Sequence, residues 1–68
     1  MKKLEFETSM ISLKDLLKAT NLVSSGGLGK AIIKDQGVLV NGDICFVPGK
    51  KLYKNDKIIF EDCEITII

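Results

Sequence analysis

Residues 24–43, SSGGLGKAIIKDQGVLVNGD, contain the pattern that decides the fold, a helix followed directly by a β-hairpin. Apolar residues recur at helical spacing over 28–33, and Gly37 suits the position just beyond a helix end. Asn41 and Gly42 then stand between two apolar runs, which is the strongest short-range signal of a hairpin. The stretch therefore predicts a helix that ends at Gly37 and two strands that turn at Asn41-Gly42.

The glycine-rich start of this stretch lacks the spacing of a nucleotide-binding loop. A Walker-type loop needs a glycine, four residues and then Gly-Lys-Ser/Thr, but Ser24 and Ala31 occupy the positions of the first glycine and the hydroxyl. A dinucleotide fingerprint also fails, because Ile32 stands where its third glycine is required. Two interpretations remain. The glycines permit a tight turn or close helix packing, or they leave helix amides free to bind an anion.

The anion interpretation depends on how the helix begins. Either Ser24 or Ser25 can cap it, and the glycines at 26–27 leave the amides of its first turn uncovered by side chains. Unpaired N–H groups and the helix dipole both favour negative charge. Lys30 and Lys34 are four residues apart, so they share one helix face beside this end.

The elements before this stretch follow from a change of periodicity. Leu4 and Phe6 alternate with acidic residues, as in a half-buried strand. Residues 13–20 have apolar residues at helical spacing, behind an approximate capping box formed by Ser12 and Asp15. A strand and a short helix are therefore expected before the glycine-rich segment.

The elements after the hairpin are turns and strands. Pro48 and Gly49 suit the centre of a type II turn, and residues 54–56 predict another turn. Residues 57–60 and 63–68 are two further apolar runs, which predict the last strands. The order strand, helix, helix, hairpin, strands indicates an α+β fold.

Length and composition predict a small cytoplasmic domain. Residues 1–68 suffice for one domain, and a hydrophobic content of 46% supports a core. Cys45 and Cys63 lie in alternating apolar stretches, without CxxC spacing or any histidine, which favours free buried thiols. Glu5 and Glu7 interrupt the start that resembles a signal peptide, and no apolar run is long enough to span a membrane. We expect a soluble monomer without metal or cofactor.

The charge distribution favours binding over catalysis. The net charge is +1, but residues 30–57 contain six lysines against three aspartates, whereas residues 58–68 contain three acidic residues and no lysine. A basic segment is typical of a polyanion-binding face, although lysine clusters are also ordinary solvated surface. The chain has no histidine as a general base, and Ser24 and Ser25 have no base partner visible in the sequence. No enzymatic activity is therefore expected.

A second group of cations follows the hairpin. Lys50 and Lys51 can contact phosphates, and Tyr53 or Phe46 can stack on an unpaired base or simply pack at the rim of the core. The chain contains no arginine, and lysine lacks the bidentate fork that reads guanine. Recognition of shape and charge, rather than of base sequence, is therefore expected.

With its SGG.GK helix start, VLVNG hairpin and GKKL stretch in this order, the chain resembles the S-four (S4) RNA-binding domain over residues 8–67. It is similar to the short stand-alone members of the YaaA/YbcJ type. The resemblance implies two short helices packed on a small, mostly antiparallel sheet, with the second helix and the hairpin as the RNA face. The residues that match the motifs are Ser25, Gly26, Gly27, Lys30, Val40, Asn41, Gly42, Lys50, Lys51, Leu52 and the turn aspartate Asp56.

The sequence departs from this family at one place. Stand-alone members usually carry two arginines where this chain has Val47 and Pro48. That change supports an alternative, a protein-interaction module whose face is Phe46, Val47, Pro48 and Tyr53. Residues 38–60 also resemble the end of a ThiS-type β-grasp sulfur carrier, but the terminal Gly-Gly of a carrier is absent. Only a β-grasp-like role in partner binding would remain.

The sequence thus predicts a non-enzymatic module that binds structured RNA, such as rRNA or tRNA-like RNA, through phosphate contacts. The ribosome or a protein is a further possible partner, and no membrane partner is expected. The candidate RNA-binding residues are Ser25, Gly26, Gly27, Lys30, Lys34, Lys50, Lys51 and Tyr53.

Overall fold

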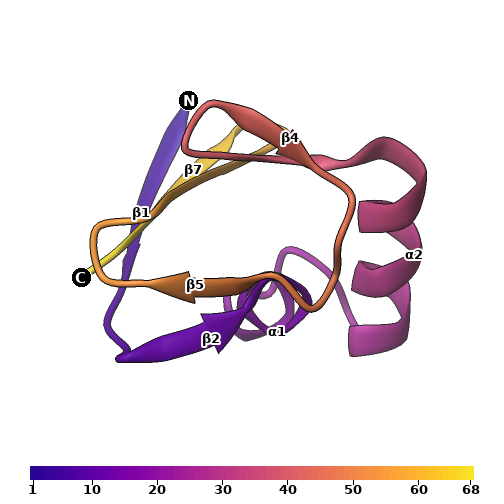
Figure 1. Cartoon of the computed structure of the whole chain (residues 1–68), viewed down its shortest axis with the longest axis horizontal. Coiled ribbons are helices and arrows are strands. Elements are labelled where there is room, and N and C mark those ends of the chain that lie inside the picture. Colours follow the sequence, from indigo (N-terminus) through magenta and orange to yellow (C-terminus); the bar gives the residue numbers. More distant parts are fainter.

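The computed structural model describes residues 1–68 as two helices, a five-stranded sheet and a two-stranded ribbon (Figure 1). The elements are β1 (Lys2–Phe6), β2 (Met10–Ser12), α1 (Leu13–Ala19), α2 (Gly26–Gln36), β3 (Val38–Val40), β4 (Asp43–Cys45), β5 (Lys51–Tyr53), β6 (Lys57–Phe60) and β7 (Cys63–Ile67). The sheet has the order β1-β7-β6-β3-β4, and β2 pairs with β5 in the ribbon. Only the β1–β7 pairing is parallel. The expected α+β class, with two helices and a mostly antiparallel sheet, is confirmed.

One hydrophobic core lies between the sheet, the helices and the ribbon. Alternation along the strands turns every second side chain inward, and the helical spacing of α1 does the same for its apolar stripe. Each such side chain stabilises the fold by about 1.5–3 kcal/mol relative to leaving it in water. The buried apolar residues are Leu13, Leu16, Leu17, Val23, Ile33, Val38, Val40, Leu52, Ile58, Phe60, Ile65 and Ile67.

Gly29 accounts for the close packing of α1 against α2. A Cβ atom at this buried position would stand 3.2 Å from Val23 Cγ2 and 3.6 Å from the carbonyl oxygen of Lys14. At Gly26 a Cβ would have no neighbour within 4 Å, and at Gly27 its neighbour would be the hydroxyl of the capping serine at 4.0 Å. Close packing is therefore the role of Gly29 and not of the two glycines at the helix start.

The ends of α2 follow the sequence signals. The Leu28 N–H donates to Ser25 Oγ at 3.1 Å, so Ser25 and not Ser24 is the cap. Gly37 ends the helix with a φ of +78°, and its N–H donates to the Ile33 carbonyl at 2.9 Å. Neither helix of the chain has the length and apolar character needed to cross a membrane.

The start of α1 differs from the expected capping box. Ser12 Oγ donates to Asp15 Oδ2 at 2.7 Å and makes no hydrogen bond to the helix backbone. The amides of Leu13 and Lys14 instead donate to the carbonyl oxygens of Lys50 at 2.9 Å and Pro48 at 3.0 Å. These two carbonyls satisfy amides that a helix start leaves unpaired. The loop between β4 and β5 is thereby fixed to α1.

The turns occur at the positions predicted from the sequence, but one of them differs from the predicted turn type. Asn41 and Gly42 have φ values of 51° and 90°, which fits the predicted two-residue hairpin. Gly49 is absent from the residues with positive φ, so the predicted type II turn is wrong. The Lys50 N–H still donates to the Val47 carbonyl at 3.1 Å and closes a turn there.

Both cysteines are free, as expected, but each is half-buried rather than buried. Cys63 lies at the start of β7, where Lys2 of the outermost strand is its parallel neighbour. Cys45 ends β4, and its Sγ accepts a hydrogen bond from the Val47 N–H at 3.5 Å. Partial exposure follows from these positions at strand ends.

Asn41 joins the hairpin to the turn between β5 and β6. Its Nδ2 donates to Asp56 Oδ1 at 3.0 Å, and its Oδ1 accepts from the Lys57 N–H at 2.9 Å. Asp56 Oδ2 also accepts from the Tyr53 N–H at 2.7 Å. Two turns far apart in sequence are thus held together by side chains.

Replacement of Asn41 by glycine is expected to lower the free energy of unfolding by about 1–2 kcal/mol, because two hydrogen bonds are lost while the positive φ remains easy to adopt. Alanine at the same position should cost about 1 kcal/mol more, since its Cβ disfavours that φ. Urea unfolding measures both. Asn55 has a φ of 77° without a side-chain hydrogen bond, so Asn55→Gly is the matched control. Equal stability of Asn41→Gly and the wild type would contradict the role of the side chain.

Candidate nucleic-acid interface

The first site is the N-terminal end of α2. Ser25 and Gly27 are exposed and Gly26 is half-buried. The Ser25 hydroxyl already accepts from the Leu28 N–H, and the Ser25 carbonyl accepts the Gly29 N–H at 3.1 Å. The amides of Gly26 and Gly27 have no acceptor within the chain. Two N–H groups at the positive end of an eleven-residue helix are therefore open to an anion.

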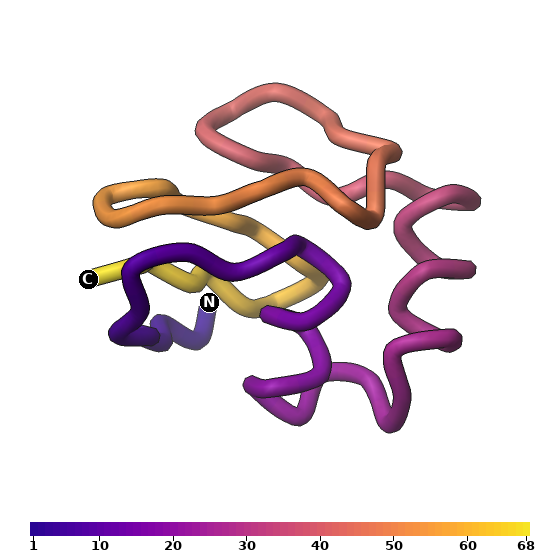
Figure 2. The backbone as a smooth tube through the Cα atoms, turned by 60° about the horizontal axis from the view of Figure 1, so that its bottom comes forward, coloured from indigo at the N-terminus to yellow at the C-terminus, as the bar shows by residue number.

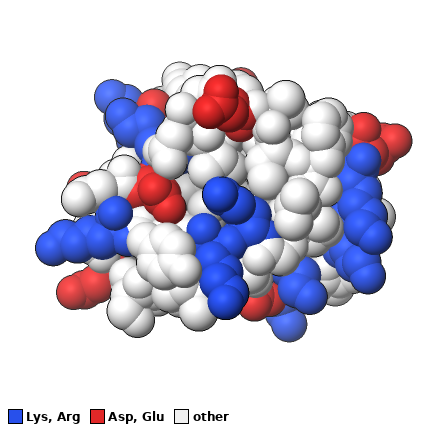
Figure 3. Space-filling view, in the orientation of Figure 1, with Lys and Arg blue, Asp and Glu red and all other residues white.

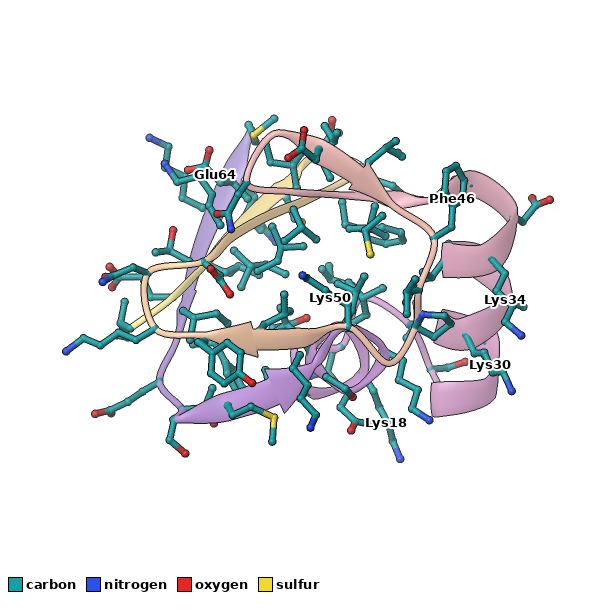
Figure 4. The ribbon with its side chains drawn as sticks, in the orientation of Figure 1. Lys18, Lys30, Lys34, Phe46, Lys50 and Glu64 are labelled. Atoms are coloured by element: carbon teal, nitrogen blue, oxygen red, sulfur yellow. The ribbon has the colours of Figure 1, made fainter.

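The lysines of α2 lie beside this end. Lys30 and Lys34 are both exposed. Figure 4 shows their side chains projecting from the same side of the helix, away from the body of the molecule. The helical spacing that predicted a shared face is thus realised.

The second site is a groove of about 680 Å³ between β4 and β5. Figure 4 shows Lys50 pointing into the space between these two strands. Lys51 and Tyr53 flank the buried Leu52 on β5, so both project from the outer side of the ribbon. All three candidate residues that follow the hairpin therefore line one groove.

The two sites share a face but not a position. In Figure 3, lysine surface appears at the centre of the face and along the side that α2 forms, and also at the opposite edge of the molecule. Lys30 and Lys34 project outward from α2, whereas Lys50 points into the space between β4 and β5 (Figure 4). The hairpin turn at Asn41-Gly42 is far from the start of α2 in both views of the backbone (Figures 1 and 2). The hairpin turn therefore lies beside the groove, which Asn41 helps to line, rather than beside the helix-start amides.

Sequence reasoning missed Lys18. This exposed residue lies in the last turn of α1. Figure 4 shows its side chain projecting from the molecule at a place that is nearer to Lys30 than to β1. The helical spacing of the apolar residues over 13–20 agrees with the exposed position of Lys18. The sequence gives no distance between Lys18 and α2, because the approach of the two helices depends on the contact at Gly29.

Sequence reasoning also left Ile44 out of every candidate face. Ile44, Phe46 and Val47 are 55%, 50% and 58% exposed. Pro48 is half-buried, and Tyr53 stands on the opposite side of the groove. The four-residue protein-binding face predicted from the sequence is therefore divided, and its apolar part continues from Val47 back to Ile44.

Comparison with known proteins agrees with the motifs. Residues 4–68 match the family described as the S4 domain. The chain is similar to the probable ribosome maturation protein RlbA of Bacillus subtilis (strain 168), with 34% identity over 58 residues that cover 85% of this chain and 82% of RlbA. The family match includes residues 38–60, the segment that also resembles a β-grasp carrier. The chain therefore belongs to the S4 domain family.

Proposed function

We propose that this protein binds structured RNA through the phosphate backbone, as a non-enzymatic factor in ribosome maturation in the cytoplasm. The observation that carries the proposal is the exposure of three lysines in an S4 domain, Lys30 and Lys34 on α2 and Lys50 at the groove. The described role of its relative RlbA supports ribosomal RNA as the ligand class.

The chemistry of the face favours phosphates over base edges. Lysine is a flexible point charge, which neutralises a phosphate but does not read a base pair in a fixed geometry. The free amides of Gly26 and Gly27 add donors of fixed direction at the end of α2. An RNA is then selected by the spacing of its phosphates, which depends on its shape.

Removal of Lys30 by the substitution Lys30→Ala is expected to weaken binding about equally for RNA hairpins of different sequence. The slope of log affinity against log salt concentration should become shallower by about one unit, because one phosphate contact is lost. Fluorescence anisotropy over a salt series measures both quantities. Lys3→Ala, in β1 at the other end of the molecule, is the control (Figure 1). A changed sequence preference with an unchanged slope would contradict the phosphate mechanism.

The role of the helix amides has a separate test at Gly26, the first residue of α2. Proline is tolerated at that position and removes only the N–H, and the extended backbone of Ser25 (φ −151°, ψ 160°) is compatible with a following proline. We expect Gly26→Pro to weaken RNA binding about two- to tenfold, the value of one hydrogen bond. Gly26→Ala keeps the N–H and adds a Cβ in open space, so it should bind as the wild type does. Equal affinities of the two variants would exclude the amide from the site.

A second candidate function is docking of a protein on Ile44, Phe46 and Val47. This function is supported by the exposure of all three apolar side chains. Ile44 lies on the edge strand β4, and Phe46 and Val47 lie in the loop that follows it. The substitution of Val47 and Pro48 for the arginines usual in related stand-alone domains points the same way. If the wild type does not bind RNA even at low salt, protein docking becomes the leading function.

A further inference from the structure

The groove between β4 and β5 has the size of a small-molecule site. Its volume of about 680 Å³ falls within the range of about 300–1,000 Å³ that ligand sites occupy. One wall consists of residues 43–47, and Lys50, Lys51 and Tyr53 line the other parts. Successive side chains of a strand point to opposite faces, so a wall made of five consecutive residues includes the edge of the main chain.

That main-chain edge has free hydrogen-bonding groups. β4 is the last strand of its sheet and pairs only with β3. The register joins Val40 to Asp43 next to the two-residue turn and Leu39 to Ile44 one step further. In such a hairpin the pair beside the turn is hydrogen-bonded and the next pair is not. The N–H and C=O of Ile44 therefore point to the open edge, as one donor and one acceptor side by side.

Two lysines, Lys50 and Lys51, and two aspartates, Asp43 and Asp56, line the groove, so an anion is favoured only next to the lysines. Lys50 points into the space between β4 and β5 (Figure 4). Its main chain is fixed, because its N–H donates to the Val47 carbonyl at 3.1 Å and its carbonyl accepts from the Leu13 N–H at 2.9 Å. Asp56 also lines the groove, but its two carboxylate oxygens accept hydrogen bonds from Asn41 and the Tyr53 N–H.

The groove also has surfaces for a flat ring. Val47, which is 58% exposed, and Tyr53, which is 52% exposed, both line the groove. Unpaired bases stack on aromatic and apolar side chains and form hydrogen bonds along their edges. A ring surface, a donor–acceptor pair and a nearby cation correspond to the base, the base edge and the phosphate of one nucleotide.

We propose that this groove binds a single unpaired nucleotide that is turned out of a structured RNA. The base lies between Val47 and Tyr53 with its edge on the main chain of Ile44, and Lys50 and Lys51 contact its phosphates. This inference rests on the proposed function and adds the feature of the RNA that is recognised. Fully paired RNA hides its base edges, so it contacts the lysines alone.

The test compares two RNA hairpins that differ only in one bulged nucleotide, which is 2-aminopurine in a fluorescent version. The wild type is expected to bind the bulged hairpin about tenfold more tightly than the paired one, the contribution of one stacked base. The 2-aminopurine fluorescence should change on binding. Affinity for the paired hairpin serves as the measure of the phosphate contacts.

Two variants separate the base site from the phosphate contacts. Ile44→Pro removes the edge N–H, and proline is tolerated in an edge strand at a group that bonds no neighbour. Ile44→Ala keeps that N–H and is its matched control. We expect Ile44→Pro and Tyr53→Ala to remove the tenfold preference for the bulge and to keep the affinity for the paired hairpin. Ile44→Ala should keep more of the preference for the bulge than Ile44→Pro does, because the edge N–H remains, and thermal melting verifies that each variant is folded.

Three results would overturn the inference. Equal affinity of the wild type for both hairpins would exclude the base site while leaving phosphate binding intact. A preference that persists in Ile44→Pro and Tyr53→Ala would place the bulge elsewhere on the protein. Binding of neither hairpin at low salt would exclude the proposed function as well, and would leave the β4 edge to an extended peptide.

Discussion

Replacement of Gly37 by alanine is expected to lower the free energy of unfolding by about 2–5 kcal/mol. Gly37 has φ 78° and ψ 164°, a region that is essentially restricted to glycine and costs other residues about 1–3 kcal/mol. A Cβ there would also lie 2.7 Å from Ile44 Cγ1 and 2.9 Å from Phe46 Cε1, and overpacking costs about 1–3 kcal/mol. A domain of this size has a total stability of only roughly 3–10 kcal/mol, so the variant should lose a large fraction of it.

Urea unfolding of three glycine variants separates the two causes. Gly42 has a φ of +90° with open space around it, so Gly42→Ala carries the conformational cost alone. Gly49 lacks a positive φ and also faces open space, so Gly49→Ala should change stability by less than about 0.5 kcal/mol. Adding Ile44→Ala to Gly37→Ala should restore only the part due to the clash with Ile44, because the contact with Phe46 Cε1 at 2.9 Å remains. A Gly37→Ala variant as stable as Gly49→Ala would contradict the strained junction between α2 and β3.

Reversal of both lysine charges at the groove, by Lys50→Glu with Lys51→Glu, is expected to reduce RNA affinity at low salt by about a hundredfold or more. Two attractive contacts to phosphate become repulsive, and repulsion between like charges acts most strongly at low ionic strength. Both side chains are exposed, so the fold should be retained. Fluorescence anisotropy with a structured RNA hairpin measures the loss, and circular dichroism verifies the fold.

The matched control is Lys54→Glu with Lys57→Glu, which makes the same change in net charge. Both control lysines are exposed, and neither lines the groove. A general effect of net charge would weaken binding equally in the two double variants. We expect the control to lose much less affinity, because local contacts carry the binding. Equal losses would argue against a defined site at Lys50 and Lys51.

The candidate site was predictable as a set of residues but not as an arrangement. The absence of histidine and arginine, the six lysines of residues 30–57 and the motif order indicated phosphate binding without any structure. The exposure of Lys30 and Lys34 followed from helical spacing alone. The groove at Lys50 could not be predicted, because its walls are strands β4 and β5, which do not pair with each other.

The helices and turns themselves were determined by local sequence. Ser25 and Gly37 set the ends of α2, and Asn41-Gly42 set the hairpin, because caps and tight turns depend on the dihedral angles and side chains of a few neighbouring residues. The same local rules gave the strand at β1 and the last two strands. They failed for the type of turn at Pro48-Gly49, where the carbonyls of the loop accept hydrogen bonds from the first amides of α1.

Only the tertiary structure decided which distant segments meet. The parallel pairing of β1 with β7 and the ribbon of β2 with β5 join segments from opposite parts of the chain, and no local pattern specifies such a register. The same holds for the Lys50 and Pro48 carbonyls that satisfy the first amides of α1. These contacts form because a common core must bury both partners and leave no buried amide unpaired, which is a condition on the whole chain rather than on any one stretch.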